Sequence, residues 1–140
     1  MKLEKVIDEN FYQIHKAVSE RRQCKLPHNK LYYHLIVLAL KDSMRYTKKH
    51  TDNKTISAAA NAANKNKLFQ QNYHREEARK WLSGRVAKHV WEAYLNGHDY
   101  QILRERLEIL WERLDGIKKL DQRIKMGTSL RLRLGRLESK

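Results

Sequence analysis

The sequence predicts a single all-α domain of about five helices with a basic C-terminal extension. The first observation is a scarcity of helix breakers, because the 140 residues include one proline and five glycines, and the first glycine is Gly84. A protein rich in sheet turns would need more of both. The second observation is that apolar residues recur at spacings of three and four along most of the chain. We expect the helical domain to cover residues 1–126 and the basic arm to cover residues 127–140.

The balance of charge indicates a polyanionic partner. Lys and Arg total 30 against 16 Asp and Glu, which gives a formal net charge of +14. So large a charge repels itself in a compact fold, and nucleic acid is the first partner expected to offset it. A mean hydropathy of −0.84 argues against a membrane protein. The single cysteine, Cys24, cannot form an internal disulfide, and no secretory signal is evident at the start, so we expect a cytoplasmic location without membrane contact.

The first two helices are predicted from their apolar stripes. Apolar residues from Leu3 to Val18 repeat with helical spacing and predict a helix over residues 3–20. Pro27 suits the opening of a second helix, with Asn29 as a cap. This second helix carries two stripes and should therefore be covered on several sides. The stripes are Leu31, Leu35 and Leu38, and Tyr33, Val37, Leu40 and Met44.

A basic ridge is predicted where this second helix continues past Leu40. Lys41, Arg45 and Lys48 follow at i, i+4 and i+7 and would lie on one helical face. The functional interpretation is a phosphate-facing ridge. The alternative is that these cations favour the negative end of a helix and are simply solvated there.

The segment from Thr51 to Asn72 admits a helix-turn-helix interpretation. After a polar break, Ser57 can cap a short helix of small residues that ends near Asn64, and Asn64 would take the left-handed turn position. Lys65, Lys67 and the amides that follow would then contact phosphates and base edges. The alternative is a packing helix of small residues followed by a polar turn. The helix-turn-helix possibility alone makes DNA somewhat favoured over RNA.

Two further helices follow. The apolar spacing from Tyr73 to Leu95 predicts one helix with a weak point at Gly84 and a C-terminal end at Asn96-Gly97. Asp99 is expected to cap the next helix. That next helix carries a heptad-like seam and is acidic, so it is either the core-facing helix or a homodimer interface. The seam residues, our candidates for self-association, are Leu103, Leu107, Leu110 and Leu114.

The C-terminal segment is basic and has a different pattern. Leu130, Leu132 and Leu134 alternate with Arg131 and Arg133, a period of two that is typical of a strand. We interpret residues 127–140 as a basic arm for nucleic acid, against the alternative of a frayed terminus.

Signatures of enzymes and metal sites are mostly missing from the sequence. It has no glycine-rich phosphate loop, and its seven histidines lack metal-binding spacing, so no cofactor or metal is expected. The segment from Arg45 to His50 has an Arg-x4-His spacing. It resembles the Arg-x4–6-His motif of HEPN-type ribonucleases, which are all-helical and often dimeric. The resemblance covers six residues and implies that Arg45 would stabilise a phosphorane-like charge while His50 moves a proton.

We therefore expect a non-enzymatic protein that binds the nucleic-acid backbone through basic helix faces and its C-terminal arm. The alternatives are a metal-independent ribonuclease that uses Arg45 and His50, and a helical subunit of an RNA–protein complex. A homodimer or a larger protein assembly is possible on either account. The candidate nucleic-acid-binding residues are Lys41, Arg45, Lys48, Lys49, Lys65, Lys67, Arg75, Arg79, Arg85, Lys88, Arg131, Arg133 and Arg136.

Overall fold

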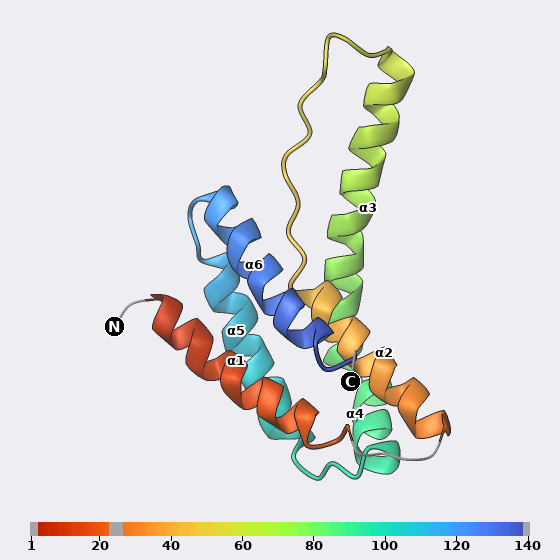
Figure 1. The fold of residues 1–140 in the computed structure, drawn as a ribbon, viewed down its shortest axis with the longest axis vertical. Coiled ribbons are helices and arrows are strands. Elements are labelled where there is room, and N and C mark those ends of the chain that lie inside the picture. The colour runs from red at the N-terminus through yellow and green to blue at the C-terminus, as the bar shows by residue number, and fades with distance from the viewer. Residues whose placement is uncertain (1–2, 23–26, 139–140) are drawn as a thin grey trace.

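The part of the chain that the structure describes forms six α-helices and one π-helical turn, and the all-α prediction is confirmed (Figure 1). The computed structural model describes residues 3–22 and 27–138. The elements are α1 (Leu3–Ser19), α2 (Pro27–Ser43), α3 (Ala58–Leu82), α4 (Arg85–His89), η1 (Val90–Tyr94), α5 (Tyr100–Asp115) and α6 (Leu120–Gly135). Helix α1 packs on α5, and α2 packs between α3 and α6.

The N-terminal helix forms as its apolar stripe predicts. Ile7, Phe11, Ile14 and Val18 are buried along one face of α1, and they pack against the inner face of α5. Burying four such side chains stabilises the fold by several kcal/mol, at about 1.5–3 kcal/mol each. The expected C-terminal end at residue 20 lies one residue beyond the observed end at Ser19.

Only one of the two stripes on α2 is buried. Tyr33, Val37, Leu40 and Met44 belong to the core, as predicted. The prediction that the second stripe is also covered was wrong, because Leu35 and Leu38 line only an open pocket at the edge of the contact between α2 and α3. Leu31, Leu35 and Leu38 are 60%, 41% and 51% exposed.

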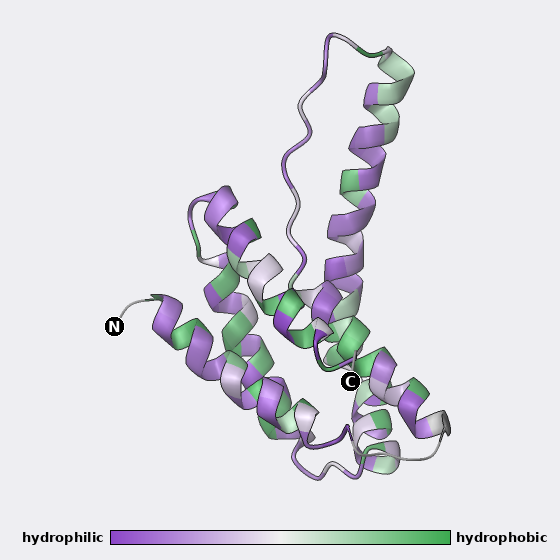
Figure 2. Cartoon of the chain, viewed as in Figure 1, coloured by the Kyte–Doolittle hydropathy of each residue, from purple (hydrophilic) through white to green (hydrophobic). Residues whose placement is uncertain are grey.

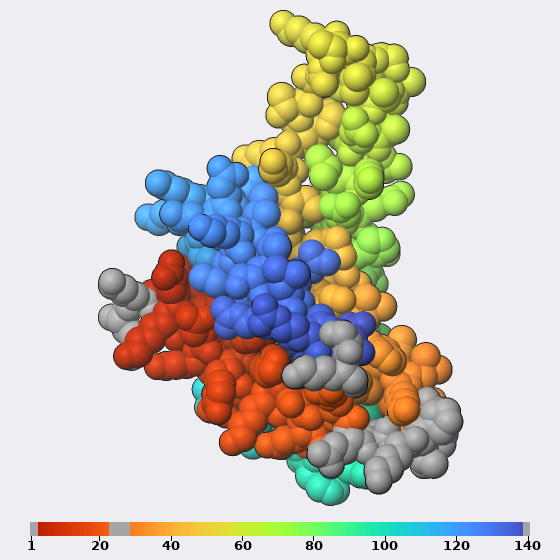
Figure 3. Space-filling view, in the orientation of Figure 1, coloured from red at the N-terminus to blue at the C-terminus, as the bar shows by residue number. Residues whose placement is uncertain are grey.

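A long projection leaves the body of the molecule after α2. Residues 45–56 run without helix or strand and lie alongside α3 (Figure 1). Helix α3 has 25 residues and is therefore about 38 Å long, and its outer half stands clear of the other helices. Figure 3 shows the two segments, in yellow and green, packed side by side above the rest of the surface. We call residues 47–74 the projection.

Hydrogen bonds between side chains and backbone join the two segments of the projection. The Asn53 amide N–H donates to Asn61 Oδ1 at 2.9 Å, and Asn61 Nδ2 donates to the Asn53 carbonyl at 3.1 Å. Thr47 Oγ1 donates to Asn72 Oδ1 at 3.2 Å nearer the body. One face of α3 is thereby covered by the extended segment, which leaves the other faces open to solvent.

The helix-turn-helix prediction was wrong. Helix α3 runs without interruption through Asn64, which is helical and takes no left-handed turn. The predicted cap is correct, since Ser57 Oγ accepts a hydrogen bond from the Ala60 amide at 3.1 Å. With good helix formers at Leu68, Gln70 and Gln71 after the alanines, propensity favours a single continuous helix.

The helix predicted from Tyr73 to Leu95 is broken in the middle. Helix α3 ends at Leu82, and Gly84 becomes the N-cap of α4 with an extended backbone. The C-terminal end at Asn96-Gly97 is as predicted. Asn96 has a φ of 53°, and the Gly97 amide donates back to the Trp91 carbonyl at 3.0 Å. A Cβ at Gly97 would lie 2.1 Å from Trp91 Nε1, so only glycine fits this turn.

The leucine seam of α5 belongs to the core of one chain. Leu103, Leu107, Leu110 and Leu114 are buried, mainly by the packing of α1 on α5. The interpretation of these residues as a self-association surface was therefore wrong, because they offer no exposed area to a second copy. Asp99 lies at the N-cap of α5 as predicted, but its side chain makes no capping hydrogen bond.

The C-terminal segment is helical where a strand was predicted. Leu130 and Leu134 lie one turn apart in α6 and are buried, whereas Leu132 between them is 64% exposed. Leucines at 130, 134 and 137 have helical spacing, so the sequence is compatible with a helix as well as with a strand. The packing of this segment on α2 selects the helix. Helix α6 also runs through the boundary predicted between residues 126 and 127, so most of the arm is part of the packed domain.

Gly127 permits the close crossing of α6 over the end of α2, which leads to a stability prediction. A Cβ at this position would lie 2.4 Å from the Met44 carbonyl oxygen and 3.1 Å from Tyr46 Cδ2. Because the carbonyl is backbone, Gly127→Ala should force the helices apart and destabilise the fold by about 1–3 kcal/mol. Chemical denaturation measures this loss.

Gly135→Ala in the same helix is the matched control. A Cβ there meets nothing within 4 Å, so this variant should be neutral or slightly more stable. Equal stability of the two variants would show that the crossing is not tight.

Candidate nucleic-acid interface

The projection concentrates positive charge. Across residues 47–74 there are five lysines and one acidic residue, Asp52, which gives a net charge of +4 with neutral histidines. All five lysines are exposed, and Asp52 lies 2.8 Å from His50 Nε2. The lysines are Lys48, Lys49, Lys54, Lys65 and Lys67.

Amide and aromatic side chains lie among these cations. The projection carries seven Asn or Gln residues, and Figure 2 shows mainly hydrophilic residues along it, apart from the alanine-rich start of α3. Two aromatic rings on α3 are exceptions, since Phe69 is 68% exposed and Tyr73 is 54% exposed. Cations, amides and exposed rings are the side-chain types that contact phosphates, base edges and base faces.

A polar cluster at the base fixes the projection to the body. Arg79 Nη1 donates to Asp115 Oδ2 at 2.7 Å, and its Nε donates to the Ser43 carbonyl at 2.9 Å. Its Nη2 donates to the Tyr46 hydroxyl at 2.8 Å. One guanidinium thereby joins α3 to α5, to the last residue of α2 and to the start of the extended segment.

The ionisation of this cluster is set by its own hydrogen bonds. Burial alone would raise the pKa of Asp115, but hydrogen bonds from Arg79 and Tyr46 outweigh it and lower that pKa below the usual value. The Tyr46 hydroxyl donates to Asp115, and burial together with this bond raises the pKa of Tyr46 to about 12. At neutral pH the cluster is therefore an arginine cation, a carboxylate and a neutral phenol.

Further contacts complete the base. The Arg75 guanidinium lies 4.6 Å from the centre of the Tyr46 ring and donates to the Arg45 carbonyl at 3.0 Å. Trp111 Nε1 donates to Ser43 Oγ at 3.0 Å inside the core. Arg75 and Arg79 were predicted to contact phosphate, but their side chains are only 18% and 12% exposed. They are positioned to support the projection rather than to face a ligand.

The predicted basic ridge is not a single helical face. Helix α2 ends at Ser43, so Arg45 and Lys48 lie beyond it on the extended segment. Lys41 Nζ forms an ion pair with Glu138 at 3.3 Å, and Arg45 forms one with Asp42 at 3.3 Å. Of the residues predicted for the ridge, only Lys48 is an exposed cation of the projection.

The remaining predicted cations lie away from the projection. Arg85 and Lys88 are exposed on α4, at the opposite end of the molecule from the tip (Figure 1). On α6, Arg131 lies near Arg45 and Asp42, and burial together with the charge of Arg45 lowers its pKa. Arg133 and Arg136 face α1 instead.

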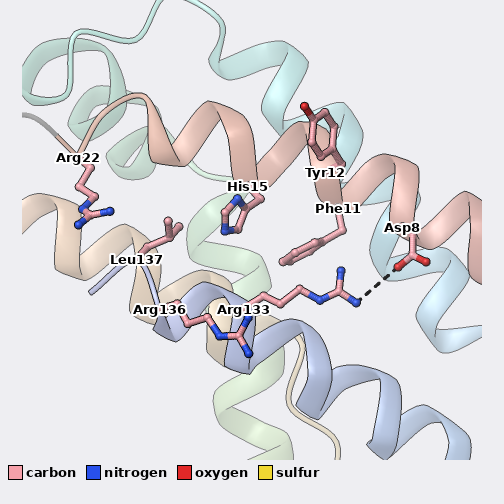
Figure 4. A pocket seen from close by; sticks show the side chains of 8 residues that line it. All are labelled: Asp8, Phe11, Tyr12, His15, Arg22, Arg133, Arg136 and Leu137. Atoms are coloured by element: carbon pink, nitrogen blue, oxygen red, sulfur yellow. Dashed lines mark ion pairs between the residues drawn. The ribbon is translucent and has the colours of Figure 1, made fainter. Parts of the chain in front are cut away.

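These two arginines line a cavity of about 320 Å³ between α1 and α6 (Figure 4). Phe11 and His15 point into it from α1, while Tyr12 points away. Arg133 lies 5.3 Å from the centre of the Phe11 ring and pairs with Asp8 at 3.7 Å. Burial and the charge of Arg133 lower the pKa of His15, with a backbone hydrogen bond opposing them. These five cations (Arg85, Lys88, Arg131, Arg133 and Arg136) thus lie in separate regions, on α4 and α6, and not on the projection.

Arg45 and His50 are not brought together on one helical face. Both lie beyond the end of α2, on the segment without helix or strand, and so not on successive turns of a helix. Arg45 is paired with Asp42, and His50 lies against Asp52. The geometry therefore lacks the helical juxtaposition that the resemblance to HEPN-type ribonucleases implies.

Sequence reasoning did not single out Lys54, Phe69 and Tyr73, which are exposed on the projection together with the predicted lysines. Lys54 stands in a polar break that was interpreted only as a connection. Phe69 and Tyr73 have residue types that normally belong to a core, and only the length of the free-standing helix shows them to be exposed.

Comparison of the chain with protein-family models, with curated proteins and with solved structures finds no match. Within residues 3–22 and 27–138, no helix is long and apolar enough to cross a bilayer. The same part of the chain contains no group of three or more His, Cys, Asp or Glu side chains arranged to hold a metal ion.

Arg79→Met tests the role assigned to the base. The variant leaves the Ser43 carbonyl, Tyr46 and Asp115 without their shared donor, and because Asp115 is half exposed we expect a loss of about 2–3 kcal/mol at pH 7. A carboxylate with a lowered pKa contributes stability above its unfolded pKa of about 4 and loses it as the pH falls through the folded value. The difference in the free energy of unfolding between wild type and Arg79→Met, measured by urea denaturation, should therefore shrink below about pH 4.

Arg79→Lys is the matched control for charge. It keeps the cation but not the forked geometry, so its stability should be intermediate. If the difference in the free energy of unfolding between wild type and Arg79→Met stays constant down to pH 2, the ion pair with Asp115 does not contribute to stability.

Proposed function

We propose that this protein binds nucleic acid without catalysing a reaction, and that the projection is its interface. The observation that carries the proposal is the combination of five exposed lysines, one acidic residue and two exposed rings on a narrow, free-standing element. A domain gains no core from such an element, since its outer half buries little apolar surface against the body. A surface that binds a partner accounts for it.

Charge complementarity favours a polyanion over a protein partner. Lysine is depleted at protein–protein interfaces, whereas phosphate contacts supply most of the affinity of non-specific nucleic-acid binding. The projection contains one acid, Asp52, against five exposed lysines, so an approaching phosphate meets a net positive charge. The acidic helix α5 lies in the body, away from the projection (Figure 1).

The shape of the projection favours neither DNA nor RNA. The preference for DNA rested on a helix-turn-helix, and α3 is one continuous helix. The proposal is therefore backbone binding with contributions from amides and rings, and it includes an RNA–protein complex as one setting. The absence of a helical Arg45–His50 pair favours binding over RNA cleavage.

Replacing four lysines tests the proposal. If about four phosphates are contacted, the log–log dependence of affinity on salt should have a slope near −4 for duplex DNA and near −3 for single strands. A variant with Lys48, Lys49, Lys65 and Lys67 changed to Gln should bind at least tenfold more weakly at low salt, with a slope close to zero. Fluorescence anisotropy of labelled oligonucleotides measures both quantities.

A variant with equal loss of charge elsewhere is the control. Lys5, Lys118, Lys119 and Lys125 are exposed on the body, and changing them to Gln should leave affinity and slope nearly unchanged. Equal weakening by the two variants would show that net charge, not the projection, drives binding. RNA cleavage by wild type in a chelator that His50→Ala abolishes would instead favour the ribonuclease alternative.

A further inference from the structure

The two exposed rings of α3 form one ridge with a lysine. Lys65, Phe69 and Tyr73 are spaced at i, i+4 and i+8, so each lies on the turn after the last with a small rotation. Helical geometry places successive members about 6 Å apart along the axis. Asn66 and Gln70 lie next to this ridge on the open side of the helix, away from the segment that contacts Asn61 and Asn72.

The rings make no contribution to the core. Phe69 and Tyr73 are absent from the buried cluster and from the apolar residues packed against it. They remain 68% and 54% exposed, and the other exposed residues of α3 between Asn64 and His74 are polar. Two large rings, one turn apart and exposed to water, indicate a binding surface.

A protein partner fits this ridge poorly. Complete burial of two rings removes at most about 500 Å² from water, at 150–250 Å² each, whereas a stable protein interface needs about 800 Å² per partner. Toward the tip the neighbours of the rings are Lys65 and amides, and lysine is depleted at such interfaces; the exposed acids Glu76 and Glu77 follow one turn after Tyr73, toward the body. The neighbours toward the tip suit a nucleic-acid strand, in which phosphates and base faces alternate.

We infer that the ridge binds single-stranded nucleic acid, with unpaired bases stacking on Phe69 and Tyr73 while the neighbouring lysines contact the phosphates. This inference rests on the proposed function and specifies its ligand. Bases of a duplex are stacked on one another inside the helix, so their faces are not available to a side chain. The 6 Å step along α3 is close to twice the 3.4 Å spacing of stacked bases and leaves room for a base beside each ring.

Alanine variants of the two rings test the inference. Stacking on an aromatic side chain is worth about 1–3 kcal/mol per base, so Phe69→Ala and Tyr73→Ala should each weaken binding to single strands by about tenfold. Binding to a duplex of the same length should change by less than twofold. The probes are a labelled thymidine 20-mer, a uridine 20-mer and a matched DNA duplex, titrated by anisotropy at fixed salt, and the two single strands distinguish DNA from RNA as the ligand.

Three controls keep the outcome interpretable. Tyr12→Ala removes an equally exposed ring from α1 and should leave all affinities unchanged. Phe69→Tyr keeps a stacking ring and should bind single strands within about threefold of wild type. Circular dichroism should show the helical content of wild type in every variant.

Each result bears on the inference separately from the proposed function. Unchanged single-strand affinity in both alanine variants, together with strong weakening by the lysine variant, overturns the stacking inference and leaves backbone binding standing. Equal loss for duplex and single strand also overturns stacking on unpaired bases. No binding to any probe overturns both. A wild-type dimer that Phe69→Ala converts to monomers shows instead that the ridge contacts a second copy.

Discussion

The fork of hydrogen bonds from Arg79 is the interaction on which the rest of the structure depends. Its guanidinium donates to Asp115 on α5, to the Ser43 carbonyl at the end of α2 and to Tyr46 at the start of the extended segment. One side chain of α3 thereby contacts three other segments of the chain. The direction of the projection is set here, because its outer half has no core of its own. Lysine could not make the same three contacts, since it lacks the planar fork.

Burying this cluster has a cost that its complete hydrogen bonding offsets. A guanidinium only 12% exposed loses hydration, and so does the carboxylate beside it. Each of the three Arg79 nitrogens has an acceptor, and the aromatic rings of Tyr46 and Trp111 lie beneath the positive charge at 5.9 and 5.4 Å. Buried polar groups that have all their hydrogen bonds specify one arrangement of the helices. Contacts between leucines alone would allow one helix to shift along another. The hydrogen-bonded base thereby fixes the place of the projection, and of its exposed lysines, relative to the body.

Features that depend on neighbouring residues in the sequence were predicted correctly. Features that depend on which helices pack together were not. The stripe of α1, the Ser57 cap and the turn at Asn96-Gly97 each depend on neighbouring residues and were predicted correctly. The exposure of Leu31 and the helical state of Leu130–Leu134 depend on which helices lie alongside, and the pattern alone admits either outcome. Four of the residues predicted to bind nucleic acid, Lys48, Lys49, Lys65 and Lys67, lie exposed on the projection, and their role stays a prediction. The rings of the projection were missed because an aromatic residue on a helix normally indicates a core.

The central claim is that nucleic acid contacts the projection and not the cations of α4 and α6. Photo-crosslinking with an oligonucleotide that contains 4-thiothymidine, followed by mass-spectrometric mapping of the crosslinked peptides, tests it most directly. The account predicts crosslinks within residues 47–74, with Phe69 and Tyr73 among the modified positions. Crosslinks concentrated on Arg85 and Lys88, or in the cavity between α1 and α6 beside Arg133 and Arg136, would contradict it.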